Sequence, residues 1–223
     1  MLGLDAQVLA HDRRVVVKGL VALVVHGKLE VEGGMLVTVS GDGKQCYPVH
    51  MRKATIPDTE TSDTALAALA ARLSEKILEH ELKLASAESC TGGWIAKCLT
   101  DISGSSEWFE RGFVTYSNSA KMTMLGVSAD TLASRGAVSE ESVREMAAGA
   151  VRHSQAQVAV AVSGIAGPAG GSADKPVGTV WIAWAWPDRS VSAKAFHFGG
   201  NREAVRRAAV MEALKGLLDG IGH

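Results

Sequence analysis

Apolar positions along the chain follow two kinds of spacing from Thr61 onward. Stretches in which apolar residues recur every three or four positions predict amphipathic helices. Such stretches begin behind Ser62, Gly93, Ser139 and Asn201. Short continuous apolar or β-branched runs predict buried strands. The predicted strands are 82–87, 112–116, 157–162, 179–186 and 191–198.

Strands that alternate with helices predict an α/β fold, which we expect to be a three-layer α/β/α sandwich. Pro187 and Asp188 lie between the last two strands and predict a tight turn. That pair is then antiparallel, so the sheet is expected to be mixed. A chain of 223 residues can bury one core of ordinary size and has no room for a second large domain. We therefore expect a single domain over 58–223.

Residues 1–57 differ from the rest of the chain and form a predicted N-terminal extension. Short valine-rich pieces alternate there with glycines, and the segment ends at Ile56 and Pro57. This pattern is typical of short hairpin strands or of loose chain. The apolar run 15–25 is broken by Lys18 and Gly19, and it is too short to cross a bilayer.

Composition narrows the partners and the compartment. A formal net charge of −1 provides no positive field for nucleic acid or for an anionic membrane. We expect neither as a partner. The three cysteines have no CxxC spacing, which indicates a reducing compartment and a cytoplasmic protein.

Ser89 is a candidate nucleophile because it follows a predicted strand and precedes a glycine pair that opens a helix. Unpaired N–H groups at a helix start could hold an oxyanion formed beside this serine. The alternative is that Ser89 and Thr91 only cap the helix. The turn is not the nucleophile elbow of α/β-hydrolases, since the positions two before and two after Ser89 are not glycines. Cys90 is either a competing nucleophile or a small buried hydrophobe.

A nucleophilic serine needs a base, and none of the seven histidines lies in a triad or metal motif. Lys121 is the candidate, because a lysine desolvated among neutral neighbours can lose its proton near neutral pH. Tyr116 precedes it by five positions. The alternatives are a surface lysine and a tyrosine that packs in the core.

Two further segments could bind phosphate. The glycine-rich loop 163–171 matches neither the Walker A nor the GxGxxG pattern, and it is either a single-phosphate cradle or an exposed turn. Arg202, Arg206 and Arg207 open the last helix. They could hold a phosphate or form a solvated helical face.

Five ordered motifs together resemble one known family. They are Ala87-Glu88-Ser89-Cys90-Thr91-Gly92-Gly93, Tyr116-Ser117-Asn118 with Lys121, Gly136-Ala137-Val138-Ser139, Ser163-Gly164-Ile165-Ala166-Gly167-Pro168, and Pro176-Val177-Gly178-Thr179-Val180. Over about residues 63–220 the chain resembles the CinA carboxy-terminal domain family, the nicotinamide mononucleotide deamidases. The resemblance implies hydrolysis of nicotinamide mononucleotide to nicotinate mononucleotide and ammonia in pyridine nucleotide salvage, without a metal or cofactor.

The resemblance also implies roles for particular residues. Ser89 would be the nucleophile, Lys121 its base, and Tyr116 a partner that tunes or relays the proton. Arg202 would meet the nucleotide phosphate. The other implied substrate-binding residues are Ala87, Thr91, Gly92, Ser163 and Gly164. Family members commonly have threonine where this chain has Ser163, so the hydroxyl is kept and a methyl contact is lost. Glu88 is a further candidate for recognising the edge of the nicotinamide ring.

Three further expectations concern the N-terminal residues, the oligomeric state and the alternative functions. A segment beginning at Met51 would itself be a reasonable start for a stand-alone family member, so we hypothesise that residues 1–50 are poorly ordered or not native. The five tryptophans either pack in the core or lie at a subunit interface, and we expect a homo-oligomer, with a dimer favoured. Two alternative functions are a non-catalytic nucleotide-binding module and a serine amidase for another small carboxamide.

Overall fold

The computed structural model describes residues 61–222 together with six short strands within residues 6–48, and these form two separate units. The strands of the first unit pair antiparallel in chain order. They are β1 (Ala6–Val8), β2 (Arg14–Val17), β3 (Leu20–Val25), β4 (Lys28–Val31), β5 (Met35–Val39) and β6 (Cys46–Pro48). Residues 49–60, which include Ile56 and Pro57, lie outside the described residues. The domain boundary and the hypothesis about residues 1–50 therefore stay predictions.

The second unit alternates helices and strands along the chain. Its elements are α1 (Asp63–Glu79), β7 (Leu84–Glu88), α2 (Trp94–Thr100), a short 3-10 helix (Ser105–Glu107), β8 (Phe109–Val114), α3 (Asn118–Leu125), α4 (Ala129–Ser134), α5 (Glu140–Arg152), β9 (Val158–Gly164), β10 (Thr179–Ala185), β11 (Val191–His197) and α6 (Arg202–Gly220). No helix among residues 61–222 combines the length and the hydropathy needed to span a bilayer.

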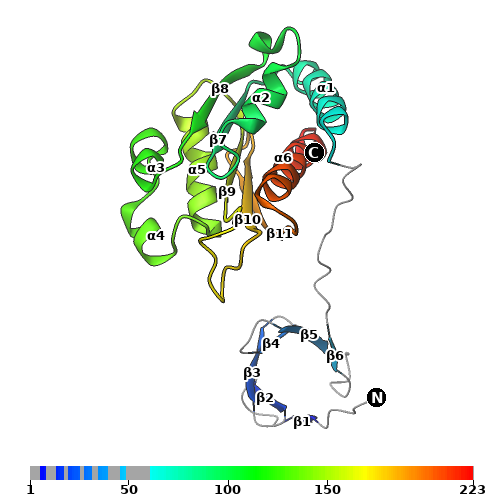
Figure 1. Ribbon diagram of the computed structural model, residues 1–223, viewed down its shortest axis with the longest axis vertical. Coiled ribbons are helices and arrows are strands. Elements are labelled where there is room, and N and C mark those ends of the chain that lie inside the picture. The colour runs from blue at the N-terminus through cyan, green and yellow to red at the C-terminus, as the bar shows by residue number, and fades with distance from the viewer. Residues whose placement is uncertain are drawn as a thin grey trace. The chain divides into compact units, whose positions relative to one another are not determined.

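The five strands of this unit form one mixed sheet in the order β11-β10-β9-β7-β8. β7 is parallel to both β8 and β9, whereas β10 is antiparallel to β9 and β11. Helices α1, α2 and α6 contribute to the core cluster on one face of the sheet, and α5 covers the other (Figure 1). The predicted three-layer sandwich with a mixed sheet is confirmed.

The core forms because β9 lies in the middle of the sheet with both faces covered. Val158, Val160 and Val162 pack in the cluster with α1 and α6, while Ala159 and Ala161 belong to the cluster with α5. The small alanine side chains let α5 approach the sheet closely. Trp108 and Trp184 are buried in the first cluster, whereas Trp94, Trp181 and Trp186 pack against the two clusters and stay partly exposed. The expected homo-oligomer therefore stays a prediction.

The cap signals located three helices correctly, and two helices were missed. The side chains of Ser62, Ser139 and Asn201 each accept a backbone N–H at the start of α1, α5 and α6. Helices α3 and α4 were not predicted, because they are short and carry weak apolar periodicity. Their caps Ser117 and Ser128 were the available signals.

Helix α5 contacts the end of α3 through a glycine. A Cβ atom at Gly149 would lie 2.1 Å from the backbone oxygen of Leu125, the last residue of α3. The absence of a side chain at this position therefore sets the distance between the two helices.

We expect Gly149→Ala to destabilise the protein by about 1–3 kcal/mol, because the added methyl group meets backbone that cannot rotate away. Intrinsic helix propensity alone predicts the opposite sign, a gain of about 1 kcal/mol. Urea unfolding of Gly149→Ala and of the neighbouring Ala148→Gly measures both changes. A stabilised Gly149→Ala variant would contradict the close contact.

Candidate active site

Ser89 lies at the carboxyl end of β7, in a tight turn that leads into α2. Its backbone N–H donates to the Val162 carbonyl at 3.0 Å, which holds the turn against the end of β9. Gly92 and Gly93 follow with φ values of +62° and +96°. These left-handed conformations are strained for other residues, so the glycine pair is what makes the turn this tight. The side chain of Ser89 is almost completely buried.

Lys121 lies in α3, which follows β8, and its side chain contacts Ser89. Its Nζ donates to the Ser89 Oγ at 2.9 Å and to the Thr115 carbonyl at 2.8 Å. The side chain is only 1% exposed, and this burial lowers the pKa of Lys121 below its ordinary value. Among residues 61–222 no carboxylate lies within ion-pair distance of it. A desolvated amine thus sits within proton-transfer distance of a hydroxyl.

The sheet topology brings these two residues together. β7 and β8 are parallel neighbours, so their carboxyl ends meet at one edge of the sheet. The Thr115 N–H donates to the Glu88 carbonyl at 2.8 Å and extends the pairing beyond β8. The chain then turns into α3, which begins at the Ser117 cap and carries Lys121 in its first turn.

Glu88 has a different place from the one predicted. Its carboxylate is completely buried and accepts the backbone N–H groups of Gly93, Ile95 and Ala96 at 2.8–3.0 Å. This side chain therefore caps α2 and does not reach toward a substrate ring. The expectation that the helix-end N–H groups hold an oxyanion is also wrong, because Glu88 already occupies three of them and the Trp94 N–H donates to the Thr91 carbonyl.

Cys90 is a poor nucleophile in this position. Burial raises the pKa of its thiol to about 12, so the reactive thiolate is scarcely populated at neutral pH. Cys98 is likewise a buried free thiol. Both cysteines fit the interpretation of small buried hydrophobes.

Tyr116 contacts Arg202 in this structure. The hydroxyl of Tyr116 accepts from the Arg202 Nη2 at 2.7 Å, and the Arg202 Nη1 donates to the Gly167 carbonyl at 2.8 Å. Tyr116 is 61% exposed, so it is not a core ring. Arg202 thus links the chain just before α3 to the glycine-rich loop.

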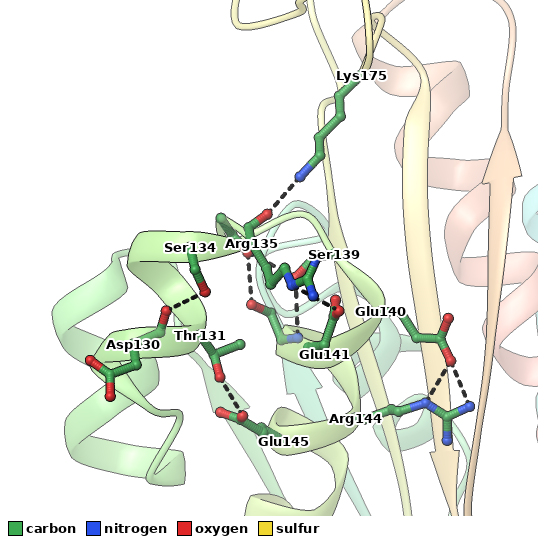
Figure 2. Close-up of polar contacts among 12 residues, drawn as sticks. Asp130, Thr131, Ser134, Arg135, Ser139, Glu140, Glu141, Arg144, Glu145 and Lys175 are labelled. Atoms are coloured by element: carbon green, nitrogen blue, oxygen red, sulfur yellow. Dashed lines mark hydrogen bonds and ion pairs between the residues drawn. The ribbon is translucent and has the colours of Figure 1, made fainter. Parts of the chain in front are cut away.

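Ser163 and Gly164 end β9 next to the segment 136–139. The Ser163 hydroxyl donates to the Ala137 carbonyl at 2.7 Å. Lys175 donates to the Arg135 carbonyl at 2.7 Å and holds the start of this segment, as Figure 2 shows. A Cβ atom at Gly164 would lie 2.6 Å from Val180, so only glycine allows β10 this close.

The remaining predicted substrate residues differ in accessibility. Gly92 is exposed, whereas Ala87 and Thr91 are fully buried. The Ala87 side chain belongs to the core cluster with α5, which leaves it no surface for a substrate. The buried Thr91 hydroxyl has no hydrogen-bond partner among residues 61–222.

Two arginines of α6 have contacts that the sequence did not reveal. Arg207 forms ion pairs with Asp63 and Glu203. Arg206 donates to the carbonyls of Cys90 and Thr91, directly behind the Ser89 turn. The contacts to Asp63, Cys90 and Thr91 could not be read from residue spacing, because these partners are far apart in the chain. The Glu203–Arg207 pair, four positions apart in one helix, has a spacing that the sequence does show.

Cavity size alone does not mark this site. A cavity of about 510 Å³ lies beside His80, Trp186 and Asp188, away from Ser89. A smaller groove of about 380 Å³ borders Gly92, Gly93 and Arg206, next to the turn. The buried Ser89 and Lys121 mark the site instead, because they bring reactive groups into contact. Residues 61–222 contain no cluster of three or more metal-ligating side chains.

The fold and the site define a class: three-layer α/β proteins with a buried serine and lysine in contact at the carboxyl edge of the sheet. Residues 66–221 match the family described as the CinA C-terminal domain. The chain therefore belongs to this family, which confirms the resemblance seen in the motifs.

Similar proteins with known names cover the same region. Nicotinamide-nucleotide amidohydrolase PncC of Escherichia coli strain K12 is 52% identical over 156 residues, which are 70% of this chain and 94% of that protein. PncC of Pseudomonas putida is 53% identical over 150 residues, 67% of this chain and 93% of that protein. The crystal structure of the competence/damage inducible protein CihA from Agrobacterium tumefaciens has a TM-score of 0.68 at 46% identity, covering 71% of this chain and 95% of the other.

The lowered pKa of Lys121 has a consequence for stability. Between this pKa and the ordinary value of about 10.4, the unfolded chain binds a proton that the folded chain does not. Wild-type stability should therefore fall as the pH is lowered through this window. Lys121→Met removes the amine, so its stability relative to wild type should rise over the same window, as measured by urea unfolding at several pH values.

The exposed Lys97 provides the matched control, because its amine pairs with Asp101 at the surface. Lys97→Met should show no such gain as the pH falls. If Lys121→Met and wild type have parallel pH profiles, the lowered pKa is contradicted.

Proposed function

We propose that this chain hydrolyses the carboxamide of nicotinamide mononucleotide to give nicotinate mononucleotide and ammonia. The observation that carries the proposal is the 2.9 Å contact between the Lys121 Nζ and the Ser89 Oγ in a buried site. The PncC relatives are 52% and 53% identical to this chain over the matched residues, and their names support the substrate class.

In the proposed acylation step, Lys121 acts as the base. Its amine accepts the proton of Ser89 while the serine oxygen attacks the carboxamide carbon. The Thr115 carbonyl, which already accepts from the Lys121 Nζ, stabilises the ammonium that forms. The tetrahedral intermediate collapses when this ammonium returns a proton to the amide nitrogen, and ammonia leaves.

Water then completes the reaction. Lys121, again neutral, deprotonates a water molecule that attacks the acyl carbon of the Ser89 ester. The ester bond breaks, and the proton returns to the serine oxygen. A neutral amine is required at the start of both half-reactions, so the same burial that lowers the pKa of Lys121 serves both.

The surrounding residues are proposed to bind the nucleotide. Arg202, which is exposed beside the glycine-rich loop, would receive the phosphate in place of one of its present contacts. Tyr116 holds Arg202 and lies between it and the helix of Lys121, and its relay of a proton remains a prediction. Ser163 and Gly164 would line the pocket at the end of β9. Ala87 is left out of the substrate contacts because its side chain is buried in the core.

Ammonia release from nicotinamide mononucleotide, nicotinamide riboside and nicotinamide tests the substrate and the nucleophile together. We expect turnover only of the phosphorylated compound. Ser89→Ala should lower kcat by at least about 10³-fold, because the covalent intermediate can no longer form. Cys90→Ala removes only a buried thiol and should remain close to wild type.

The outcomes separate the alternatives. Undiminished activity in Ser89→Ala would remove the serine mechanism. Preference for an unphosphorylated amide would favour a serine amidase of other specificity, and binding of the nucleotide without turnover would favour a non-catalytic module.

Arg202→Ala should raise KM for nicotinamide mononucleotide by about 10- to 100-fold, the amount expected when a charge-assisted contact to phosphate is lost. The value of kcat should change much less, since the phosphate contact is the same in the ground and transition states. Steady-state kinetics measures both constants. An unchanged KM would show that Arg202 does not bind the phosphate and only links Tyr116 to the glycine-rich loop.

A further inference from the structure

Arg206 donates two hydrogen bonds to the turn that follows Ser89. Its Nε donates to the Cys90 carbonyl at 3.0 Å, and its Nη2 donates to the Thr91 carbonyl at 2.7 Å. These two nitrogens share one edge of the planar guanidinium, so a single rigid group holds two successive carbonyls. Arg206 lies in the second turn of α6, more than a hundred residues later in the chain.

One Arg206 contact and one backbone contact within the turn determine where two N–H groups point. In a trans peptide the N–H is directed opposite to the C=O, and the peptides of this turn are trans. The Cys90 carbonyl, held by Arg206, shares its peptide with the Thr91 N–H. The Ser89 carbonyl accepts from the Gly92 N–H at 3.1 Å and shares its peptide with the Cys90 N–H. Both peptides are therefore fixed through their oxygens.

The N–H groups of Cys90 and Thr91 are free donors. Neither donates to any other residue within the described 61–222 segment, whereas Glu88 occupies the N–H groups at the start of α2. Free backbone donors of fixed direction beside a nucleophile are the form that oxyanion stabilisation takes in acyl transfer.

We propose that Arg206 is a positioning residue that holds the Cys90–Thr91 peptide so that the Thr91 N–H, together with the Cys90 N–H, receives the oxyanion formed when Ser89 attacks. This inference rests on the proposed amide hydrolysis. The positive charge of Arg206 also polarises the carbonyls it binds, which makes the N–H of the same peptide a stronger donor. Its charge is directed to the turn, since no carboxylate within residues 61–222 lies at ion-pair distance.

Arg207 is a matched control on the same helix. Both guanidinium groups lie over the Trp94 ring, at 5.2 Å for Arg206 and 4.8 Å for Arg207. Arg207, however, bonds to Asp63, Glu203 and the Thr61 carbonyl, and to no group of the Ser89 turn. The two arginines share charge and ring contact, and they differ in the contact to the turn.

The first test compares steady-state kinetics of Arg206→Ala, Arg206→Lys and Arg207→Ala with nicotinamide mononucleotide. Arg206→Ala should lower kcat by about 10- to 100-fold with little change in KM, because the oxyanion exists only in the transition state. Arg206→Lys keeps the charge but lacks the planar fork, so it should recover part of the loss. Arg207→Ala should keep the wild-type kcat. Equal kcat values for the two alanine variants would overturn the proposal.

The second test measures the reactivity of Ser89 itself and does not require the natural substrate to be known. A fluorophosphonate reacts with an activated serine: the serine oxygen bonds to phosphorus, fluoride leaves, and the serine proton passes to the base. The phosphoryl oxygen then occupies the place of the oxyanion. Mass spectrometry of the intact protein over time should show slower labelling of Arg206→Ala than of Arg207→Ala, and none for Ser89→Ala.

The two tests fail in distinguishable ways. If nicotinamide mononucleotide is not hydrolysed but Arg206→Ala is labelled slowly, the positioning role stands and the substrate assignment fails. If the nucleotide is hydrolysed and Arg206→Ala equals wild type in both assays, the substrate stands and the positioning role fails. If Arg206→Ala does not unfold cooperatively, it is not properly folded, and Arg206→Lys replaces it in both assays. A wild-type kcat and a wild-type labelling rate in Arg206→Lys would then overturn the proposal.

Discussion

The chemistry of this site depends on a lysine amine that has been taken out of water without being given a counter-ion. A buried ammonium is costly unless it is paired, and Lys121 has only a hydroxyl and a carbonyl oxygen as partners. The balance consequently shifts toward the neutral amine, which is the form that can accept a proton from Ser89. A single carboxylate beside Lys121 would restore the charged form and remove this property.

A carboxylate is nevertheless present one residue before Ser89, and the fold directs it elsewhere. Glu88 lies on β7, and its oxygens accept N–H groups at the start of α2. There the negative charge meets the positive end of the helix and satisfies donors that would otherwise be buried and unpaired. This arrangement also divides the backbone donors near Ser89 into two groups. Those of the helix are used for structure, and those of the turn stay available.

The start of α6 shows how one helix can serve several parts of a site. Arg202 reaches the glycine-rich loop and Tyr116, Arg206 reaches the turn of Ser89, and Arg207 is tied to α1 through Asp63. Arg202 and Arg206 are four positions apart and lie on one face of the helix, one turn above the other, whereas Arg207 is turned to a neighbouring face. The three arginines therefore reach three sets of partners.

The type and order of most elements in residues 61–222 follow from the amino-acid sequence alone. Buried strands such as β9 have continuous apolar runs, and Ser62, Ser139 and Asn201 mark helix starts through local hydrogen bonds. The motifs also identified Ser89 and Lys121 as candidates, because a short polar motif between a strand and a helix is visible in one dimension. Helix α3, which carries Lys121, was missed because eight residues with weak periodicity resemble a loop.

The pairing of polar groups, in contrast, depends on how distant segments pack in three dimensions. The direction of the Glu88 side chain, the burial of Ala87 and the contacts of Arg206 depend on elements that pack together from distant parts of the chain. The spacing of apolar residues predicts the helix or strand to which a residue belongs. The partner that a residue meets across the sheet depends on the order and direction of the strands. Ser89 and Lys121 meet because β7 and β8 are parallel neighbours that end at the same edge.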